Sequence, residues 1–385
     1  MGDDPHAPRY VSVSVSRQAD AAPAVAEALR GIDLGATCFL LAFVPVGLKL
    51  DEVARALEDG SAGVPVFGCT TAGAITPLGY ENGALLLIAF PREHFRAASM
   101  LIAPLKPLPI NSLTTELRSH AARFRPTARW NRLALIFADG LSRQEELLVT
   151  MLETALGEVP IFGGSAGDDL AFHQTFVLHN GRFHRNAALL LLLETDLEFR
   201  GLGFDHFLPT DCQMVVTEAI PDERLVLEIN GAPAALEYAR LVGRPVDQLS
   251  PQVFAENPIL VRQNANYHVR AIHDAPGANA LSFLGAIDDG LILTLGRGKE
   301  ILQTLEAGLD IRDQRGAAPD FVLGFECVLR KLEIEQKRLS GPVSEVFRRR
   351  RVIGFNTYGE QHCGVHVNQT FVGVAFFEPH IRELS

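Results

Sequence analysis

The sequence predicts an α+β protein in which mixed sheets are covered by helices. Short apolar runs, which are typical of strands, alternate with segments whose apolar residues recur at helical spacing. Asn-Gly pairs follow several of the runs, as they do in β-hairpins. A pattern of strand, bend and strand also occurs three times, which indicates a fold built from related units.

The first part of the chain supplies both kinds of element. After a loose leader, apolar residues alternate with serine over 10–16, as in a half-buried strand. Gly31 and Gly60 follow the first two predicted helices and end them. The predicted strands lie at 10–16, 38–44, 84–90 and 95–103, and the predicted helices at 23–30, 50–58 and 111–124.

The same order then begins again. Ser142 and Glu145 have the spacing of a capping box, which predicts the start of a helix that Gly157 ends. A hairpin is expected at 179–181, and the last helix is expected to end at the Ser-Gly-Pro of 340–342. Further strands are predicted at 133–137, 187–193, 225–229, 267–272, 280–285, 291–295 and 321–325, and further helices at 233–243, 299–309 and 328–339.

Three glycine bends carry the internal repeat. Segments 64–68 and 159–163 differ at one position, and each is an apolar run that ends in glycine. Segments 68–73 and 354–359 share the pattern Gly-x-x-Thr-x-Gly. If the three units pack side by side, their polar bends converge, and bends beside strand ends are where ligands usually bind.

Composition and charge limit the class of protein. The 385 residues suffice for two or three domain-sized units, and the net charge of −11 argues against nucleic acid as a partner. The basic run 348–351 is expected to be a solvated edge or a docking spot for an acidic partner. Because no apolar run approaches the ~20 residues of a membrane span, and no signal peptide is evident, we expect a cytoplasmic protein without membrane insertion.

The five cysteines are scattered without CxxC spacing. This arrangement predicts reduced thiols and excludes a zinc ribbon and covalent c-type haem attachment.

Residues 351–371 are the strongest candidate for the wall of a pocket. An apolar approach meets a glycine and is followed by Thr, Tyr, Glu, Gln, His and Asn, all of which offer hydrogen-bond donors or acceptors. A hairpin with a solvated polar face has the same composition.

Four motifs, at 68–73, 162–168, 325–330 and 354–370, resemble those of the FIST sensory proteins. The resemblance covers nearly the whole chain. It implies an N-terminal module at 37–228 and a C-terminal module at 229–385, with a strand and helix at 1–36 before them. Both modules would be built of repeated strand-helix-strand-bend-strand units.

The resemblance also implies a function. FIST modules are thought to bind small ligands for signal transduction, with amino acids as one proposal. A subset of the stand-alone members binds haem, senses nitric oxide and acts on a partner histidine kinase. This chain looks like those members, since it consists of FIST modules throughout. The expectation is therefore a non-enzymatic sensor with non-covalent b-type haem, and it leaves open a homodimer.

The candidate ligand-binding residues come from the motifs and the bends. They are Gly68, Thr70, Thr71, Gly163, Ser165, Arg330, Thr357, Tyr358, Glu360, Gln361, His366 and Asn368. Arg330 would meet a carboxylate or a haem propionate, or else lie on the surface of its helix.

Haem iron requires an axial ligand in an apolar pocket, and His366, His362 and His268 are the alternatives. On one extended strand, residues 362, 366, 368 and 370 would share a face. A zinc site made by 362, 363 and 366 is disfavoured because the side chain of Cys363 would point to the other face.

Two alternatives to the haem sensor stay open. One is a sensor for an amino acid or a similar metabolite without haem. The other is a hydrolase or transferase that uses Cys69 or Thr70 as the nucleophile with His366 as the base. The Gly-rich segment 296–299 lacks the spacing of a phosphate-binding loop and is expected to be a tight turn.

Overall fold

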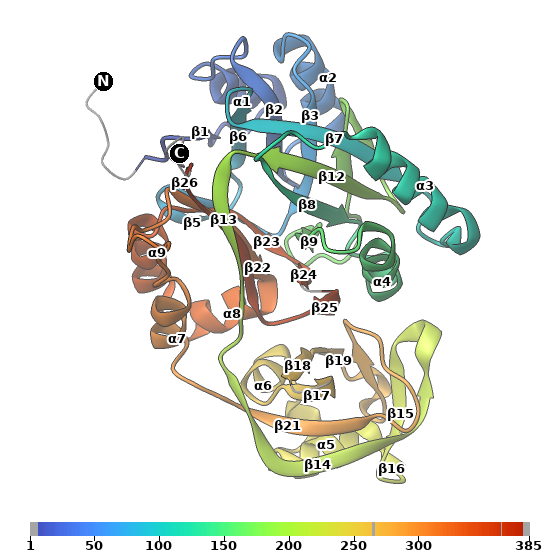
Figure 1. Cartoon of the computed structure of the whole chain (residues 1–385). Coiled ribbons are helices and arrows are strands. Elements are labelled where there is room, and N and C mark those ends of the chain that lie inside the picture. Colours follow the sequence, from blue (N-terminus) through green and yellow to red (C-terminus); the bar gives the residue numbers. More distant parts are fainter. Residues whose placement is uncertain (1–6, 264–265, 363, 380–385) are drawn as a thin grey trace.

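A computed structural model describes residues 7–263, 266–362 and 364–379. Two lobes are visible in Figure 1. The upper lobe, which we call the body, consists of the elements up to β13 and from α7 onward. The lower one, which we call the inserted lobe, is formed by the elements from β14 to β21.

The strands of the body form three groups along the chain. They are β1 (Ser12–Ser16), β2 (Thr37–Pro45), β3 (Val66–Thr71), β4 (Ala74–Thr76), β5 (Gly79–Glu81), β6 (Leu85–Pro91) and β7 (Phe95–Ile102); β8 (Asn131–Ala138), β9 (Ile161–Ser165), β10 (Val177–His179), β11 (Arg182–His184), β12 (Ala188–Thr195) and β13 (Leu197–Phe204); and β22 (Phe321–Cys327), β23 (Val352–Thr357), β24 (Glu360–His362), β25 (Val365–Val367) and β26 (Phe371–Pro379).

These strands build three six-stranded sheets that have the same plan. The orders are β1-β6-β2-β3-β10-β11, β7-β12-β8-β9-β24-β25 and β13-β26-β22-β23-β4-β5. In each sheet the third and fourth strands are parallel, while the other neighbours are antiparallel. The three related units expected from the sequence are therefore confirmed, and the fold is α+β with mixed sheets.

The units exchange their hairpins in a cycle. The hairpin β4–β5 of the first unit pairs with β23 of the third, and β24–β25 of the third pairs with β9 of the second. The hairpin β10–β11 of the second unit pairs with β3 of the first. Each sheet is complete only when another unit contributes to it, so the three units form one folding body.

The repeated glycines occupy equivalent positions in this plan. Gly68, Gly163 and Gly354 lie opposite Ala42, Ile136 and Gly324 on the parallel neighbour strand. A Cβ atom at these glycines would lie 1.9, 1.9 and 1.8 Å from the carbonyl oxygen of the opposite residue. Their φ angles of 148, 157 and 156° are also unfavourable for other residues. Glycine is required here so that the two backbones can approach.

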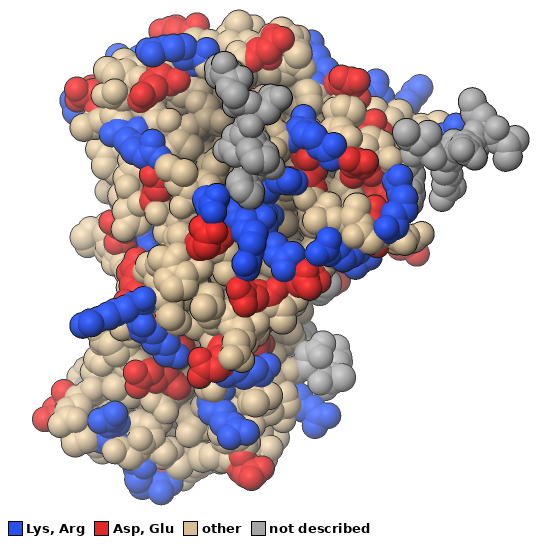
Figure 2. Space-filling view, turned by 90° about the vertical axis from the view of Figure 1, so that its left-hand side faces the viewer, with Lys and Arg blue, Asp and Glu red and all other residues tan. Residues whose placement is uncertain are grey.

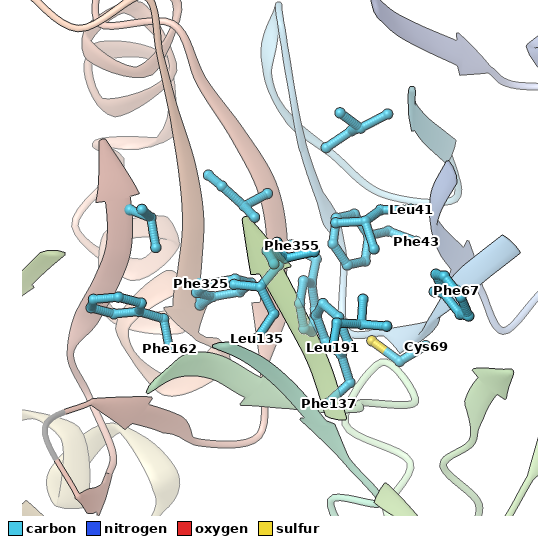
Figure 3. Packing of buried hydrophobic residues seen from close by; sticks show 14 of the residues in the cluster. Leu41, Phe43, Phe67, Cys69, Leu135, Phe137, Phe162, Leu191, Phe325 and Phe355 are labelled. Atoms are coloured by element: carbon cyan, nitrogen blue, oxygen red, sulfur yellow. The ribbon is translucent and has the colours of Figure 1, made fainter. Parts of the chain in front are cut away.

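A shared aromatic core fills the space between the three sheets (Figure 3). Phe43, Phe137 and Phe325 stand at equivalent positions of β2, β8 and β22, each one residue after the contact with the repeated glycine. Phe137 contacts Phe43 and Phe325 at ring-centroid distances of 5.9 and 6.2 Å, and Phe355 stacks on Phe43 at 4.6 Å. Edge-to-face and stacked contacts of this kind stabilise the centre of the body.

Helices cover the outer faces of the three sheets (Figure 1). Their apolar faces close three smaller cores between helix and sheet. They are α1 (Ala21–Leu29) and α2 (Leu50–Gly60); α3 (Ile110–Arg123) and α4 (Glu145–Leu156); and α7 (Ile301–Gly308), α8 (Val328–Gln336) and α9 (Ser340–Arg349). Across the described residues, no helix has the length and apolar character needed to cross a membrane.

The inserted lobe carries an eight-stranded antiparallel sheet. Its order is β18-β17-β21-β14-β15-β20-β19, with β16 paired to β15. A core around Tyr238 and Phe254 joins the sheet to two helices. The elements are β14 (Phe207–Ile220), β15 (Leu225–Ile229), β16 (Ala232–Pro233), β17 (Ile259–Gln263), β18 (Asn266–Arg270), β19 (Ile272–Asp274), β20 (Leu281–Phe283), β21 (Ile292–Gly298), α5 (Ala234–Leu241) and α6 (Pro251–Glu256), with short 3-10 turns at Pro221–Glu223, Val246–Gln248 and Pro276–Ala278.

Two local predictions were wrong. The segment expected to end a helix instead begins α9, because Pro342 lies in its first turn, where no backbone N–H is needed. The capping box is absent, since α4 begins at Glu145 and Ser142 accepts only from the Gln144 amide, at 3.3 Å.

The basic run lies at the end of α9 and beyond it. Figure 2 shows Lys and Arg side chains gathered on the face that carries α7 and α9, with acidic side chains beside them. Arg349 pairs with Glu306 at 2.9 Å, and Arg350 pairs with Asp310 at 2.9 Å. The charges of this face are thus largely compensated within the chain.

Candidate functional site

The three polar bends lie against one another, as the repeat predicted. Backbone hydrogen bonds join each pair of bends: Ala72 N to Asn356 O (3.0 Å), Gly167 N to Thr70 O (3.0 Å) and Ser165 N to Gly359 O (2.8 Å). A loop at 168–174 extends from the second bend. The bends and this loop form the part of the body from which the candidate site is built.

Asp168 holds the loop in place. Its carboxylate accepts hydrogen bonds from the amides of Phe172, His173 and Gln174 at 2.6–2.8 Å, and the Tyr358 hydroxyl also donates to it. The ring of Phe172 stacks on Tyr358 with a centroid distance of 4.6 Å. Burial, together with this hydrogen bond, raises the pKa of Tyr358, so the phenol stays protonated.

A cavity of about 310 Å³ lies between the body and the inserted lobe. Its size falls within the range of small-molecule sites, which is ~300–1,000 Å³. Most of its lining is apolar. The body contributes Leu170, Phe172, Leu329, Leu332 and Gln369, and the inserted lobe contributes Pro251, Phe254, Ala255, Ala271, Ile272, His273 and Asp274.

Polar contacts bridge the two lobes around this cavity. Gln369 Nε2 donates to Ala255 O at 3.4 Å, and Arg270 Nη1 donates to His366 O at 3.3 Å. Arg224 of the inserted lobe pairs with Glu145 and Glu146 of α4 at 2.8 and 2.7 Å. Burial raises the pKa of Glu145 to about 7, against the opposing effect of Arg224.

His366 is buried beside the interface. Gln361 Nε2 lies 3.0 Å from Ser165 Oγ and 3.3 Å from His366 Nδ1. Burial lowers the pKa of His366 to about 4, so its imidazole is neutral at pH 7. The backbone of Gly359 covers the other edge of the His366 ring. A Cβ atom added to Gly359 would lie only 2.7 Å from His366 Nε2.

Several buried polar atoms in this region have no hydrogen-bond partner among the described residues. Gln361 Oε1 and Asn368 Oδ1 are two such acceptors, and Arg270 Nε is such a donor. An unpaired buried polar atom costs about 1–3 kcal/mol. These atoms are therefore suited to a bound polar group.

Arg330 lies in the interior, which excludes the surface position considered for it. Its Nε pairs with Glu326 at 3.2 Å, and its Nη1 lies 2.6 Å from His206 Nδ1. His206 Nε2 in turn lies 2.7 Å from Glu333. Burial lowers the pKa of His206 and raises that of Glu326, whose carboxylate also accepts from the Tyr80 hydroxyl. This network ties α8 to the start of the inserted lobe.

Glu360 is fully buried between two hydroxyls. The side chains of Thr357 and Thr370 both donate to its carboxylate. Burial nevertheless raises the pKa of Glu360 to about 8. It therefore gives the interior a titratable group near neutral pH.

None of the twelve candidate ligand-binding residues lines the cavity, and Tyr358 is joined to the lining by its stack on Phe172. Thr70 Oγ1 accepts from the Phe176 amide at 3.1 Å, and Thr71 Oγ1 accepts from the Gly73 amide at 3.4 Å. The lining residues of the inserted lobe were missed because an ordinary apolar sequence carries them.

The expected common face of residues 362, 366, 368 and 370 is wrong for His362. β24 and β25 pair antiparallel, and Gln361, not His362, lies opposite His366. His362 therefore points to the other side of the hairpin, where its ring stacks on Phe162 at 5.7 Å. Cys363 lies outside the described residues.

The three candidate iron ligands are separate from the cavity, since none of them lines it. A Cβ on Gly203 would lie 2.7 Å from His362 Nε2, so backbone covers that ring as well. His268 lies on β18, where burial lowers its pKa. The described part of the chain holds no group of three or more His, Cys, Asp or Glu that could bind a metal ion.

Cys69 belongs to the central apolar core. It is fully buried, and burial raises the pKa of its thiol well above the usual range. A thiol in this environment is neither ionised nor accessible, so it lacks the activation that a nucleophile requires.

Comparisons with known proteins place the chain in a family. Residues 38–232 match the FIST N domain and residues 234–363 match the FIST C domain. The chain is also 23% identical over 280 residues to the uncharacterized protein MJ1623 of Methanocaldococcus jannaschii, covering 66% of this chain and 53% of that protein. It thus spans about half the length of that relative. The protein belongs to the FIST family of sensory signalling domains.

Proposed function

We propose that this protein is a small-ligand sensor whose ligand binds in the cavity between the body and the inserted lobe. The observation that carries the proposal is that both lobes line one cavity of about 310 Å³. A ligand there touches Phe172, whose ring stacks on Tyr358 of the converged bends, and touches Phe254 and Ile272 of the inserted lobe. An apolar, partly enclosed site at a lobe interface is the usual setting for small-molecule binding.

Ligand binding at this interface would change the position of the two lobes relative to each other. The bridges of Gln369 to Ala255 and of Arg270 to His366 are single, long hydrogen bonds. Such contacts are easily exchanged for others when the lobes shift, whereas the buried ion pairs of Arg224 with Glu145 and Glu146 would stay in place. A ligand that binds one arrangement more tightly than another shifts the population between them. The altered surface would be the signal.

Sensing of nitric oxide through a bound haem is the second candidate function. It follows from the resemblance to haem-binding members of the family. In this conformation the described residues do not fit a haem at His366 or His362, because backbone at Gly359 and Gly203 covers their Nε2 atoms. The prediction is tested by an absorption spectrum of protein expressed with a haem precursor. A stoichiometric Soret band that shifts with nitric oxide would support it, and a colourless protein would exclude it.

A polar metabolite such as an amino acid is supported by a different observation. Gln361 Oε1 and Asn368 Oδ1 could accept from an ammonium group, and Arg270 Nε could donate to a carboxylate, at a position behind the cavity, since none of these three residues lines it. All three atoms are buried and lack partners among the described residues. A histidine kinase that this protein regulates stays the predicted partner. We expect the protein to bind its ligand without converting it.

A thermal-shift screen of small metabolites tests the proposal. Ala255→Phe fills the cavity from the inserted lobe and Leu332→Phe fills it from the body, while Ala22→Phe on the exposed face of α1 is the matched control. A true ligand raises the Tm of the wild type and of Ala22→Phe but not of the two filled variants. Hits that bind all four proteins equally would contradict the proposed site.

A further inference from the structure

We propose that the cavity selects a positively charged aromatic amine, a class of ligand with a flat apolar ring and an ammonium group. The inference rests on the proposed function, because it specifies the chemistry that the same cavity takes. It is carried by the ionic and aromatic character of the lining residues.

The lining contains a single carboxylate and no cationic side chain. Among its twelve residues, Asp274 is the only acid, and neither Lys nor Arg occurs. Asp274 Oδ1 accepts from the Ala275 amide at 2.7 Å, which orients the carboxylate. A ligand anion would find no counter-charge in the lining, whereas an ammonium group would find Asp274.

Charged groups of both signs lie behind the lining, and among them the Arg270 guanidinium is engaged with His366 O across the interface. On the side of the body, the Asp168 carboxylate lies behind Tyr358 and Phe172. On the side of the inserted lobe, burial lowers the pKa of His273, so its imidazole is neutral at pH 7. Arg143, which also lowers that pKa, donates its Nη1 to Glu223 O at 3.3 Å and does not line the cavity.

Aromatic rings supply flat walls. Phe172 is stacked on Tyr358 and meets His273 edge-on with a centroid distance of 4.7 Å, so rings from both lobes contact each other at the cavity. Phe254 lines the cavity and packs on Tyr238 at 5.8 Å. Rings held in this way offer a stacking surface for a planar ligand and a favourable face for a cation.

Two probes of opposite charge test the inference by calorimetry on the full chain. Tryptamine and indole-3-propionate share an indole ring and a two-carbon chain but end in an ammonium and a carboxylate. We expect tryptamine to bind about tenfold more tightly than indole-3-propionate, because Asp274 attracts the ammonium group and repels the carboxylate. Asp274→Asn should weaken tryptamine binding about threefold, since the residue is exposed and its charge is screened by solvent, and Asp274→Lys should reverse the preference. Asp289→Asn, at an exposed site of the same lobe, is the matched control.

The possible results separate the inference from the function on which it rests. If both probes bind the wild type equally and neither binds Ala255→Phe, the charge selectivity is overturned but the cavity remains the site. The charge selectivity is also overturned, and the cavity is also kept as the site, if neither probe binds while another compound binds the wild type and fails to bind Ala255→Phe. If every compound that binds the wild type also binds Ala255→Phe and Leu332→Phe unchanged, the proposed function itself is overturned.

Discussion

Substitution of Gly163 by alanine should destabilise the body far more than an ordinary glycine substitution. A Cβ at this position would lie 1.9 Å from Ile136 O, whereas such contacts in proteins essentially never fall below 3.0 Å. The parallel strands β8 and β9 must then separate by about 1 Å, which breaks the hydrogen bonds of several of their five paired positions. At about 1 kcal/mol for each lost bond, with added strain, the loss should reach at least about 4 kcal/mol.

Gly157→Ala is the control for backbone strain alone. Gly157 has a φ of 63° and a ψ of −119°, but nothing lies within 4 Å of its Cβ position, so this change should cost only the backbone strain, about 1–3 kcal/mol. Urea unfolding followed by the fluorescence of the single Trp130 measures both variants. Gly68→Ala and Gly354→Ala should match Gly163→Ala, because they face the same clash. If Gly163→Ala loses no more stability than Gly157→Ala, the close approach of the repeated strands is refuted.

Three further predictions concern buried polar groups. Burial raises the pKa of Glu360 to about 8 in the folded protein, against about 4.3 in the unfolded chain. Its contribution to the free energy of unfolding is therefore complete below about pH 4.3 and is lost as the pH rises through 8. Glu360→Gln should flatten this pH dependence in urea unfolding, and the exposed control Glu116→Gln should not. Asp168→Asn weakens the acceptor of three amides and should speed hydrogen exchange at 172–174, unlike Asp169→Asn. Tyr80→Phe removes a donor to buried Glu326 and should lower the unfolding free energy by about 1–3 kcal/mol; an unchanged value would contradict that contact.

The internal repeat could be predicted because its signal is local. Each glycine follows an apolar run, and the same backbone contact requires it in all three units. The cyclic exchange of hairpins could not be predicted, since a hairpin such as β4–β5 has the same sequence pattern whether it pairs with its own unit or with β23. Pairing partners that lie hundreds of residues apart leave no mark in local periodicity.

The convergence of the polar bends could be predicted, but the lining of the cavity could not. The polar bends converge as expected, and Tyr358 supports the cavity wall through Phe172. The other wall comes from α6 and β19, whose apolar residues are ordinary core residues by sequence. His362 was misplaced because β24 and β25 run antiparallel, so that counting along one strand no longer gives the face.

Hydrogen–deuterium exchange on the full chain tests the central claim most directly. The compound to use is the screen hit that raises the Tm of the wild type and leaves that of Ala255→Phe unchanged. We predict slower exchange at 168–174 in the body and at 251–257 and 271–274 in the inserted lobe, with the hairpin β10–β11, which contributes no lining residue, unaffected. Protection confined to one lobe, or located away from these segments, would contradict a ligand bound between the two lobes.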